Sequence, residues 1–376
     1  MPDEIRIGMI GAGQVGRRHM TWYREIDGAN IVAVCDALPK NLAAAKADFD
    51  IPDGYADLAD LLARDDVDAV DVCVHNNKHA PITIAALAAG KHVYCEKPMA
   101  GTYRDAEDML NAAGEHGRML SIQLGSLFSM ETRVARRLMD DGHLGKAYYA
   151  RSLGYRRRGR PFVDGYATAN FVDASICAGG ALYDMGIYHI ANILYLLDNP
   201  DVLTVTGAAH QELDMYDDRR AFSNYSVEET GLGWVRLAGG ISFDIEETWA
   251  GHQAGDESSK ILGSKGGIRL DPLTFFSELS DVSGSTTFDL DAAEARWKAC
   301  FPDSPCHASP QRHWIGALQG RVDLLPTAEI ALNTMLISEG IYMSSRLARE
   351  VTADEVRAES TSTAMDPHTP EKVWEE

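Results

Sequence analysis

The stretch that decides the fold is Ile5-Arg-Ile-Gly-Met-Ile-Gly-Ala-Gly-Gln-Val-Gly16, close to the start of the sequence. An apolar run from Ile5 to Ile10 leads directly into Gly11-x-Gly13-x-x-Gly16, the order expected where a strand turns tightly into a helix. Gly11 permits the turn, Gly13 lets the backbone approach a pyrophosphate, and Gly16 lets the helix pack closely on the sheet. Free N–H groups and the positive dipole end of that helix favour phosphate. The stretch predicts a dinucleotide site built from Gly11, Ala12, Gly13, Gln14, Val15 and Gly16.

An acid at the expected distance supports this site. A second apolar run, Ile31 to Cys35, ends in Asp36, twenty residues after Gly16. An acid there accepts hydrogen bonds from the adenosine ribose hydroxyls in the dinucleotide fingerprint. Its charge also repels a 2′-phosphate, and Ala37-Leu38-Pro39 supplies no arginine to bind one. We therefore expect NAD as the cofactor, with NADP as the alternative.

Composition limits the class of protein. The chain has 376 residues, enough for two domains, and its hydrophobic fraction of 45% is ordinary for a globular protein. The formal net charge of -21 argues against a nucleic-acid partner, which requires basic patches. No apolar run approaches the length of a membrane span. Because a predicted strand begins at Ile5, we expect no signal peptide.

The six cysteines favour a reducing compartment. Cys35, Cys73 and Cys95 fall in or at the ends of apolar strand runs, where buried free thiols are expected. No C-x-x-C pair occurs, so neither a zinc ribbon nor a thioredoxin-like motif is indicated. We expect a cytoplasmic protein without a membrane partner.

The chain divides into regions of different pattern. Residues 1–125 alternate apolar strands with helical stretches, which predicts a doubly wound parallel Rossmann sheet. Residues 126–355 carry strand-like runs separated by Gly-Gly and Gly-Ser pairs, with helices at 181–197, 311–320 and 327–349. This pattern predicts an α+β domain whose open-faced, largely antiparallel sheet has helices on one side. Residues 356–376 form a polar tail that we expect to be loosely ordered.

Two polar segments follow strands of the first region. Glu96-Lys97-Pro98 comes directly after the strand 92–95, and the loop Asn76 to His79 comes after the strand that ends near Cys73. Ligands bind at the carboxyl ends of strands in such sheets, so both segments are expected beside the cofactor. The alternatives are a solvated lysine and a polar loop that caps a helix.

A third segment lies in the second region. Gly179-Gly180 precedes Asp184, Tyr188 and His189 on a predicted helix. Asp184 and Tyr188 are four residues apart and share a helix face. His189 lies about 140° round from Asp184 at roughly 100° per residue, so it points elsewhere unless the helix is distorted. The alternative is that Asp184 forms an ion pair and Tyr188 packs in the core.

With these motifs together, the chain resembles the glucose–fructose oxidoreductase / inositol dehydrogenase (Gfo/Idh/MocA) family. The resemblance covers roughly residues 4–350 and rests on Gly11–Gly16, the loop Asn76–His79, Glu96-Lys97-Pro98 and the Gly-Gly-x-Leu-x-Asp-x-Gly segment at 179–186. It implies binding of NAD(H) or NADP(H), redox chemistry on sugars and cyclitols, and a homodimer or homotetramer formed through the second sheet. The family's lysine matches Lys97 and its aspartate matches Asp184. Many members have histidine where this chain has Tyr188, so Lys97, Tyr188 and His189 all stay open as the proton-transfer group.

These assignments predict a reaction. Oxidation of a secondary alcohol needs a base for the hydroxyl proton while hydride leaves carbon, and the same group is the acid in reverse. Lys97 beside NAD⁺ would fill this role if its proton affinity were lowered by the neighbouring charge and by burial. Asp184 would hold a substrate hydroxyl or orient Lys97. No metal ion is expected, because Lys97 makes a Lewis acid unnecessary.

Two further residues are expected near the substrate. Arg156 lies in the basic run Tyr155-Arg-Arg-Arg-Gly-Arg160, which suits an anionic substrate group or a subunit interface, although a solvated loop is the simpler interpretation. His313 precedes Trp314, a pair that suits stacking on a sugar ring or packing in the core.

Three hypotheses follow. The first is an NAD-dependent dehydrogenase or reductase acting on CH–OH groups of sugars, anhydrosugars or cyclitols. The second is a glycosidase that cycles a tightly held NAD⁺ without net redox change. The third is a non-catalytic NAD-binding sensor, which would have no need of Lys97 and Asp184. Formation of NADH separates the first from the second.

Overall fold

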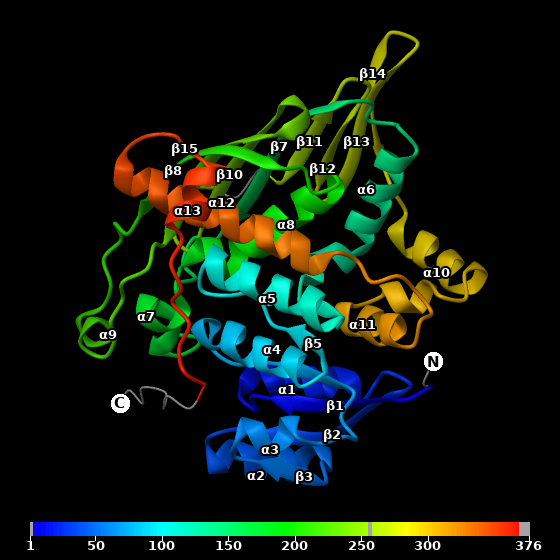
Figure 1. Cartoon of the computed structure of the whole chain (residues 1–376). Coiled ribbons are helices and arrows are strands. Elements are labelled where there is room, and N and C mark those ends of the chain that lie inside the picture. Colours follow the sequence, from blue (N-terminus) through cyan, green and yellow to red (C-terminus); the bar gives the residue numbers. More distant parts are fainter. Residues whose placement is uncertain (1–2, 255–257, 368–376) are drawn as a thin grey trace. The chain divides into compact units, whose positions relative to one another are not determined.

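The computed structural model describes residues 3–254 and 258–367. It divides into two compact units (Figure 1). Of the described residues, unit 1 contains 3–123, 302–328 and 362–367, while unit 2 contains 124–254, 258–301 and 329–361. Residues 302–328 were predicted to belong to the second domain instead. They join unit 1 because Trp314, fully buried, packs in one hydrophobic cluster with Met9 and Tyr94.

Unit 1 holds a six-stranded parallel sheet in the order β3-β2-β1-β4-β5-β6. This is the strand order of a dinucleotide-binding sheet, as predicted. Its elements are β1 (Ile5–Ile10), α1 (Gln14–Tyr23), β2 (Ala29–Cys35), α2 (Pro39–Phe49), β3 (Asp53–Tyr55), α3 (Leu58–Leu62), β4 (Ala69–Val72), η1 (Asn76–Lys78), α4 (His79–Ala88), β5 (His92–Cys95), α5 (Tyr103–His116), β6 (Leu120–Ile122), η6 (Ser304–His307) and α11 (Pro310–Leu318).

Unit 2 holds a nine-stranded sheet in the order β14-β13-β12-β11-β7-β10-β9-β8-β15. Its pairs are antiparallel except β7 with β10, so the sheet is mixed rather than wholly antiparallel. The elements are η2 (Gly125–Phe128), α6 (Met130–Asp140), β7 (Ala147–Tyr155), η3 (Ala169–Val172), α7 (Ala174–Cys177), η4 (Leu182–Gly186), α8 (Ile187–Leu196), β8 (Val202–His210), α9 (Asp217–Ala221), β9 (Thr230–Leu237), η5 (Ala238–Gly240), β10 (Ile241–Thr248), β11 (Lys260–Gly263), β12 (Gly267–Leu270), β13 (Leu273–Leu279), β14 (Val282–Thr287), α10 (Leu290–Cys300), α12 (Thr327–Leu347, which starts in unit 1), β15 (Val351–Thr352) and α13 (Ala353–Glu359).

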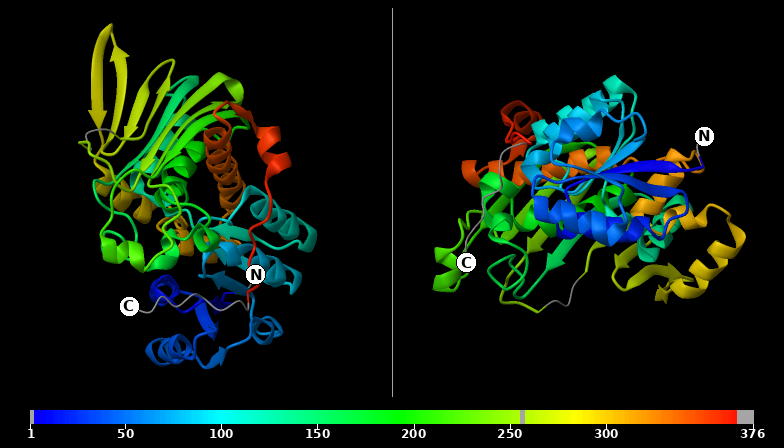
Figure 2. Two further views of the ribbon diagram at one scale, coloured as in Figure 1. Left: turned by 90° about the vertical axis from the view of Figure 1, so that its left-hand side faces the viewer. Right: turned by 90° about the horizontal axis from the view of Figure 1, so that it is seen from below.

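Helices cover one face of this sheet, as predicted (Figure 2). Helix α12 approaches β8 and β9 closely because Gly207 and Gly233 carry no side chain there. A Cβ at Gly207 would lie 2.8 Å from a side-chain carbon of Ile341, and a Cβ at Gly233 would lie 2.7 Å from another. The opposite face leaves Trp234 exposed on β9, where its ring lies 6.3 Å from that of Tyr149.

The predicted tail at 356–376 begins in an ordered helix. Thr352 and Glu355 form a capping box at the start of α13, in which each side chain binds the backbone N–H of the other. Further along, Thr363 donates its N–H to Asp105 and its hydroxyl to Asn77. Residues 368–376 of the predicted tail lie outside the described part of the chain. Within that part, no helix has both the length and the apolar character needed to cross a membrane.

Candidate active site

The glycine loop between β1 and α1 has the geometry that its motif predicts. Gly11 has a φ of +93°, and a Cβ there would lie 2.2 Å from the carbonyl oxygen of Cys73. A Cβ at Gly16 would lie 2.0 Å from the carbonyl oxygen of Gly11. A Cβ at Gly13 would meet nothing within 4 Å. Gly11 and Gly16 therefore permit the turn and the helix packing, while the backbone at Gly13 is open to a ligand.

The start of α1 is suited to an anion. Gly13 is its N-cap and supplies no side-chain oxygen to the first N–H groups, and the first turn, which contains Gln14 and Val15, has no acidic residue. Those N–H groups are therefore available to phosphate oxygens. The residues present fit the pyrophosphate of a dinucleotide.

Asp36 is tied to the same loop. Its carboxylate accepts the backbone N–H of Ala12 at 2.7 Å and that of Leu38 at 2.8 Å. The carboxylate is thus fixed beside the glycine turn, where the sequence analysis expects it to bind the adenosine ribose.

His79 links the loop 76–79 to the lysine segment. Its imidazole is buried, with Nδ1 2.8 Å from the carbonyl oxygen of Pro98 and Nε2 3.0 Å from that of Val74. Burial lowers the pKa of this histidine. His75 and His79 are spaced as some metal ligands are, but each nitrogen of His79 lies within hydrogen-bonding distance of a carbonyl oxygen, and the neutral ring can donate to one of the two. His79 therefore connects the end of the β4 segment with Pro98, while Asn76 is half-buried at the start of the loop.

Glu96-Lys97-Pro98 follows β5 directly, as predicted. The carboxylate of Glu96 is buried, and its Oε2 accepts the backbone N–H of Lys97 at 2.8 Å. Burial opposes ionisation of this carboxyl, but the hydrogen bond from His19 and the charges of His19 and Lys97 prevail and lower the pKa of Glu96. Glu96 is therefore an anion that fixes the main chain at Lys97.

Unit 2 presents Asp184 on η4, a π-helical turn. The turn follows Gly180, whose N–H binds the buried carboxylate of Glu228 at 2.9 Å, as does that of Leu182. Asp184 Oδ2 accepts the indole N–H of Trp249 at 2.9 Å and lies 3.5 Å from Nη1 of Arg156. Trp249 and Arg156 thus hold the Asp184 carboxylate from two sides.

The π turn supplies the distortion on which the placement of His189 depends. A π turn closes i→i+5 hydrogen bonds, so it holds one residue more than an α turn. His189 is five residues after Asp184. Across the π turn, it therefore lies near the position that the fourth residue after Asp184 would take in a regular α-helix. Tyr188, which the α-helical pattern paired with Asp184, is half-buried, and its carbonyl accepts the Ser126 hydroxyl at 2.8 Å.

His189 is paired with a buried acid. Its Nδ1 lies 2.8 Å from Oε2 of Glu247, and Oε1 of Glu247 accepts the hydroxyl of Ser152 at 2.6 Å. Glu247 is fully buried, whereas the His189 side chain is 35% exposed. Burial acts to lower the pKa of His189, but the charge of Glu247 and its hydrogen bond outweigh this and raise it. Arg156 is close enough to act on His189 as well as on Asp184.

Glu247 was not among the residues predicted from the sequence. Phe243, Ile245 and Glu247 alternate along β10 and all face the buried side of the sheet. An acid on an otherwise apolar face was the available signal, because a buried carboxylate requires a partner.

The basic run separates into different roles. Arg156 donates to the Tyr166 hydroxyl at 2.7 Å and lies beside Asp184, which favours the substrate interpretation. Arg160 is only 1% exposed and pairs with Asp164 and Glu229, so it holds the loop together.

His313, expected near the substrate, is buried in unit 1. Its Nε2 accepts the backbone N–H of Leu325 at 2.9 Å, and burial lowers its pKa to about 4. The neighbouring Trp314 lies 5.9 Å from the ring of Tyr94. This burial favours the packing alternative for His313.

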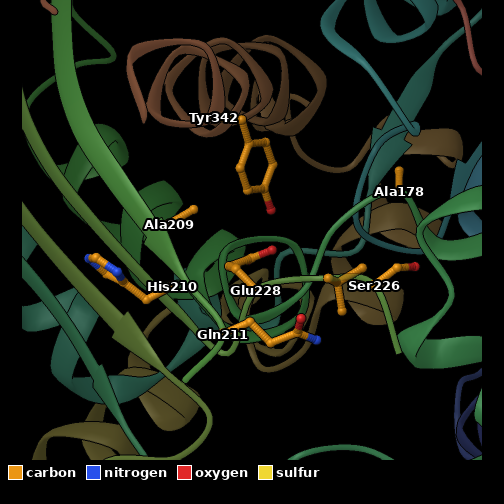
Figure 3. Close-up of a pocket in the computed structure, with 8 residues that line it drawn as sticks. Ala178, Ala209, His210, Gln211, Ser226, Glu228 and Tyr342 are labelled. Carbon is orange, nitrogen blue, oxygen red and sulfur yellow. The ribbon is translucent and has the colours of Figure 1, made fainter. Parts of the chain in front are cut away.

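Unit 2 contains a pocket of about 320 Å³. Its lining includes Glu228, and the hydroxyl of Tyr342 points toward that carboxylate (Figure 3). Burial raises the pKa of Glu228. The other lining residues are Ala178, Ala209, His210, Gln211, Ser226 and Val227. The cavity thus adjoins the residue that caps the Asp184 turn.

A dinucleotide loop on a Rossmann sheet, joined in one chain to a lysine and a histidine–carboxylate pair, defines an NAD-binding oxidoreductase. Family models agree. Residues 5–124 match the oxidoreductase family with an NAD-binding Rossmann fold, and residues 132–269 match the Gfo/Idh/MocA C-terminal domain. The chain belongs to the Gfo/Idh/MocA family.

Curated relatives are similar over much of their length. D-glucoside 3-dehydrogenase from Escherichia coli is 26% identical over 355 residues, covering 92% of this chain and 97% of the relative. A 2,7-anhydro-N-acetylneuraminate hydratase from Mediterraneibacter gnavus is 30% identical over 271 residues, 71% of this chain and 67% of the relative. Among solved structures, a levoglucosan dehydrogenase in complex with NADH and L-sorbose has a TM-score of 0.77 at 19% identity, covering 94% of this chain and 99% of the other.

Proposed function

We propose that the protein transfers hydride between NAD and a secondary alcohol or ketone of a sugar, anhydrosugar or cyclitol. The observation that carries this proposal is the pairing of His189 with the buried Glu247 in a chain that also has the glycine loop and Asp36. The relatives named above support the substrate class, since two of them are named dehydrogenases of a glucoside and an anhydrosugar.

The cofactor would be held by unit 1. The open backbone at Gly13 and the N–H groups of α1 would bind the pyrophosphate, and Asp36 would bind the adenosine ribose. When bound, NAD⁺ supplies the nicotinamide carbon that accepts hydride. The carboxylate of Asp36 would repel a 2′-phosphate, which favours NAD over NADP.

Proton transfer would fall to His189 or Lys97. Glu247 fixes Nδ1 of His189, so Nε2 is the nitrogen left to accept the proton of a substrate hydroxyl. A carboxylate behind an imidazole both orients the ring and stabilises the imidazolium that forms. Lys97 would share or replace this role, and Tyr188 stays the third candidate.

Asp184 and Arg156 would recognise the substrate. The Asp184 carboxylate is oriented by the indole N–H of Trp249 and the guanidinium of Arg156, and as a hydrogen-bond acceptor it would bind a substrate hydroxyl. Arg156 would add a contact to an anionic substituent such as a uronate.

A second candidate is a redox-neutral reaction on the same site. One of the relatives is named a hydratase, and the name describes a reaction with no net oxidation. In such a cycle His189 or Tyr188 would remove a proton from carbon and NAD would end as it began. The glycosidase hypothesis belongs to this class.

A single screen distinguishes the two. Purified protein and NAD⁺ are incubated with hexoses, pentoses, anhydrosugars, inositols and uronates, and NADH is followed by absorbance, with the same compounds and glycosides analysed for non-redox products. NADH formed with at least one alcohol substrate, and absent in His189→Asn, supports a dehydrogenase. Conversion of a glycoside or anhydrosugar without NADH overturns it in favour of the redox-neutral reaction.

We further propose a homo-oligomer formed through the outer face of the unit 2 sheet. Trp234 is 42% exposed there and Leu232 38% exposed on the same side of β9. A cytoplasmic location is supported by the six cysteines, all within the described residues and all free.

A further inference from the structure

A buried chain of polar groups runs through unit 1 beneath the lysine segment. The imidazole of His19, on α1, is fully buried. Its Nδ1 lies 2.9 Å from Oδ2 of Asp71 on β4, and its Nε2 lies 3.1 Å from Oε1 of Glu96. Asp71 is also fully buried. Three elements that are separate in the sequence therefore meet at one ring.

The geometry determines the protonation state of that ring. An ionised carboxylate only accepts hydrogen bonds, and both ring nitrogens of His19 face carboxylate oxygens. Only an imidazolium can donate to both. Burial acts to lower the pKa of His19, but the charge of Asp71 outweighs it and raises the pKa well above its usual range.

The groups around His19 are consistent with a cation. Besides Asp71 and Glu96, the thiol of Cys73 lies 3.3 Å from Nδ1 and 3.2 Å from Oδ1 of Asp71. Burial raises the pKa of this thiol, so it is neutral. Tyr94 faces the ring at 5.9 Å between centroids, and Tyr23 borders Asp71. His19, Asp71 and Cys73 lie close enough together to hold a metal ion, but hydrogen bonds already account for their arrangement.

The chain of contacts ends at Lys97. Glu96 uses Oε1 for His19 and Oε2 for the backbone N–H of Lys97. Both oxygens are thus engaged, and the carboxylate cannot rotate without losing one bond. The same histidine belongs to the helix whose first turn forms the phosphate end of the dinucleotide site.

We propose that His19 is a positioning residue for Lys97, acting as an imidazolium that is anchored by Asp71 and clamps the Glu96 carboxylate against the Lys97 main chain. This inference rests on the proposed function, in which Lys97 takes part in proton transfer. It also predicts an electrostatic effect. The positive charge of His19 offsets much of the negative charge of Glu96. When His19 is replaced by a neutral residue, the Glu96 carboxylate stabilises the ammonium form of Lys97 more strongly.

The first test needs no substrate. Lysines are labelled with acetic anhydride over a pH series, and the labelling midpoint of each lysine is read by mass spectrometry in the wild type, His19→Gln and Asp71→Asn. We expect the Lys97 midpoint to rise by at least about half a pH unit in His19→Gln, because an uncompensated carboxylate favours the ammonium. Lys40, far along the chain from the cluster, serves as the internal reference. The matched control is His92→Gln, a histidine of β5 whose Nδ1 accepts the N–H of Met119.

The second measurement is imidazole nitrogen NMR of wild type and Asp71→Asn. We expect the His19 signals to show the doubly protonated ring at pH 7.5 in wild type and to titrate at lower pH in Asp71→Asn. A singly protonated His19 ring in wild type would overturn the proposal that His19 binds Glu96 as an imidazolium. So does an unchanged Lys97 midpoint in His19→Gln that folds like wild type.

Kinetics on a substrate from the screen complete the test. We expect His19→Gln to lower kcat about tenfold or more with KM for the alcohol changed less than about threefold, and NAD⁺ affinity to stay within the same range. A loss of thermal stability with unchanged kcat and pH profile would reduce His19 to a structural residue and overturn the proposal. If wild type oxidises no sugar but the Lys97 midpoint moves as expected, the proposed function fails and the positioning role stands.

Discussion

The Nδ1 of His189 lies 2.8 Å from Oε2 of Glu247, a carboxylate fully buried on the inner face of β10. The pair is formed in unit 2, on the helix that begins with the π turn carrying Asp184. A histidine that is partly exposed and backed by a buried acid has the arrangement of a general base. Glu247 holds Nδ1 of His189, so Nε2 is the nitrogen that would exchange a proton with a substrate.

Replacing Glu247 tests this role by the pH profile. The pKa of His189 is raised by Glu247, and alcohol oxidation needs the neutral ring, so kcat/KM falls as the pH drops through that pKa. Glu247→Gln removes the charge and should move this acidic limb down by about one pH unit. Glu246→Gln, a neighbour that pairs with Arg151 instead, is the control. If the limb stays in place in Glu247→Gln, His189 is not the titrating base.

Replacing Lys97 tests its part in turnover. Lys97→Ala should lower kcat by about 10²-fold or more, the usual scale for loss of a proton-transfer group. Binding of NAD⁺, measured by calorimetry, should be retained, because we expect the pyrophosphate to bind at Gly13 and the start of α1. Near-normal turnover in Lys97→Ala would rule out the assignment and leave His189 as the sole base.

Much of unit 1 could be predicted from the sequence, because most of its strands are short, largely apolar runs. Three of them, β1, β2 and β5, are followed directly by Gly11, Asp36 and Glu96. The strand β3 escaped prediction since Asp53, Gly54 and Tyr55 are half-buried and show no apolar run. Residues 302–328 could not be assigned to unit 1, because contacts with residues distant in sequence, such as the packing of Trp314 on Met9 and Tyr94, place them there.

The candidate site was likewise only partly predictable from the sequence. Lys97 and Asp184 lie in sequence motifs, and the family resemblance that these motifs carry made them candidates. The π turn depends on how Glu228 caps Gly180 and Leu182, which spacing cannot reveal. The Glu247 partner of His189 depends on pairing between distant strands.

Asp36 should control cofactor affinity and choice. Asp36→Ala removes a charged acceptor for the ribose hydroxyls and should raise KM for NAD⁺ about tenfold, since hydrogen bonds to charged groups contribute about 1.5–3 kcal/mol. NADP⁺ should improve relative to NAD⁺, because the repulsion of its 2′-phosphate is gone. Initial rates with both cofactors measure the ratio, and a ratio equal to that of wild type would contradict this role. Asp48→Ala, an exposed acid on α2, is the control.

The outer face of the unit 2 sheet should govern the oligomeric state. Trp234→Glu places a charge among exposed apolar side chains and should shift the mass measured by light scattering toward the monomer. Phe222→Glu changes an equally exposed aromatic residue outside the sheet and should leave the mass unchanged. A monomeric wild type, or a Trp234→Glu protein of wild-type mass, would show that this face is not the interface.

Gly154 should be required for the pair between His189 and Glu247. A Cβ at Gly154 would lie 1.9 Å from Oε2 of Glu247 and 2.5 Å from Nδ1 of His189, so Gly154→Ala must displace one of them. We expect a loss of about 1–3 kcal/mol in unfolding free energy from overpacking, together with a lower kcat and a shifted acidic limb. Gly114→Ala is the control, because a Cβ there, on α5, would meet nothing within 4 Å and should stabilise the helix by about 0.5–1 kcal/mol. Chemical denaturation and pH-rate profiles measure both effects. Wild-type kinetics in Gly154→Ala would mean that the contact between imidazole and carboxylate is dispensable for the reaction.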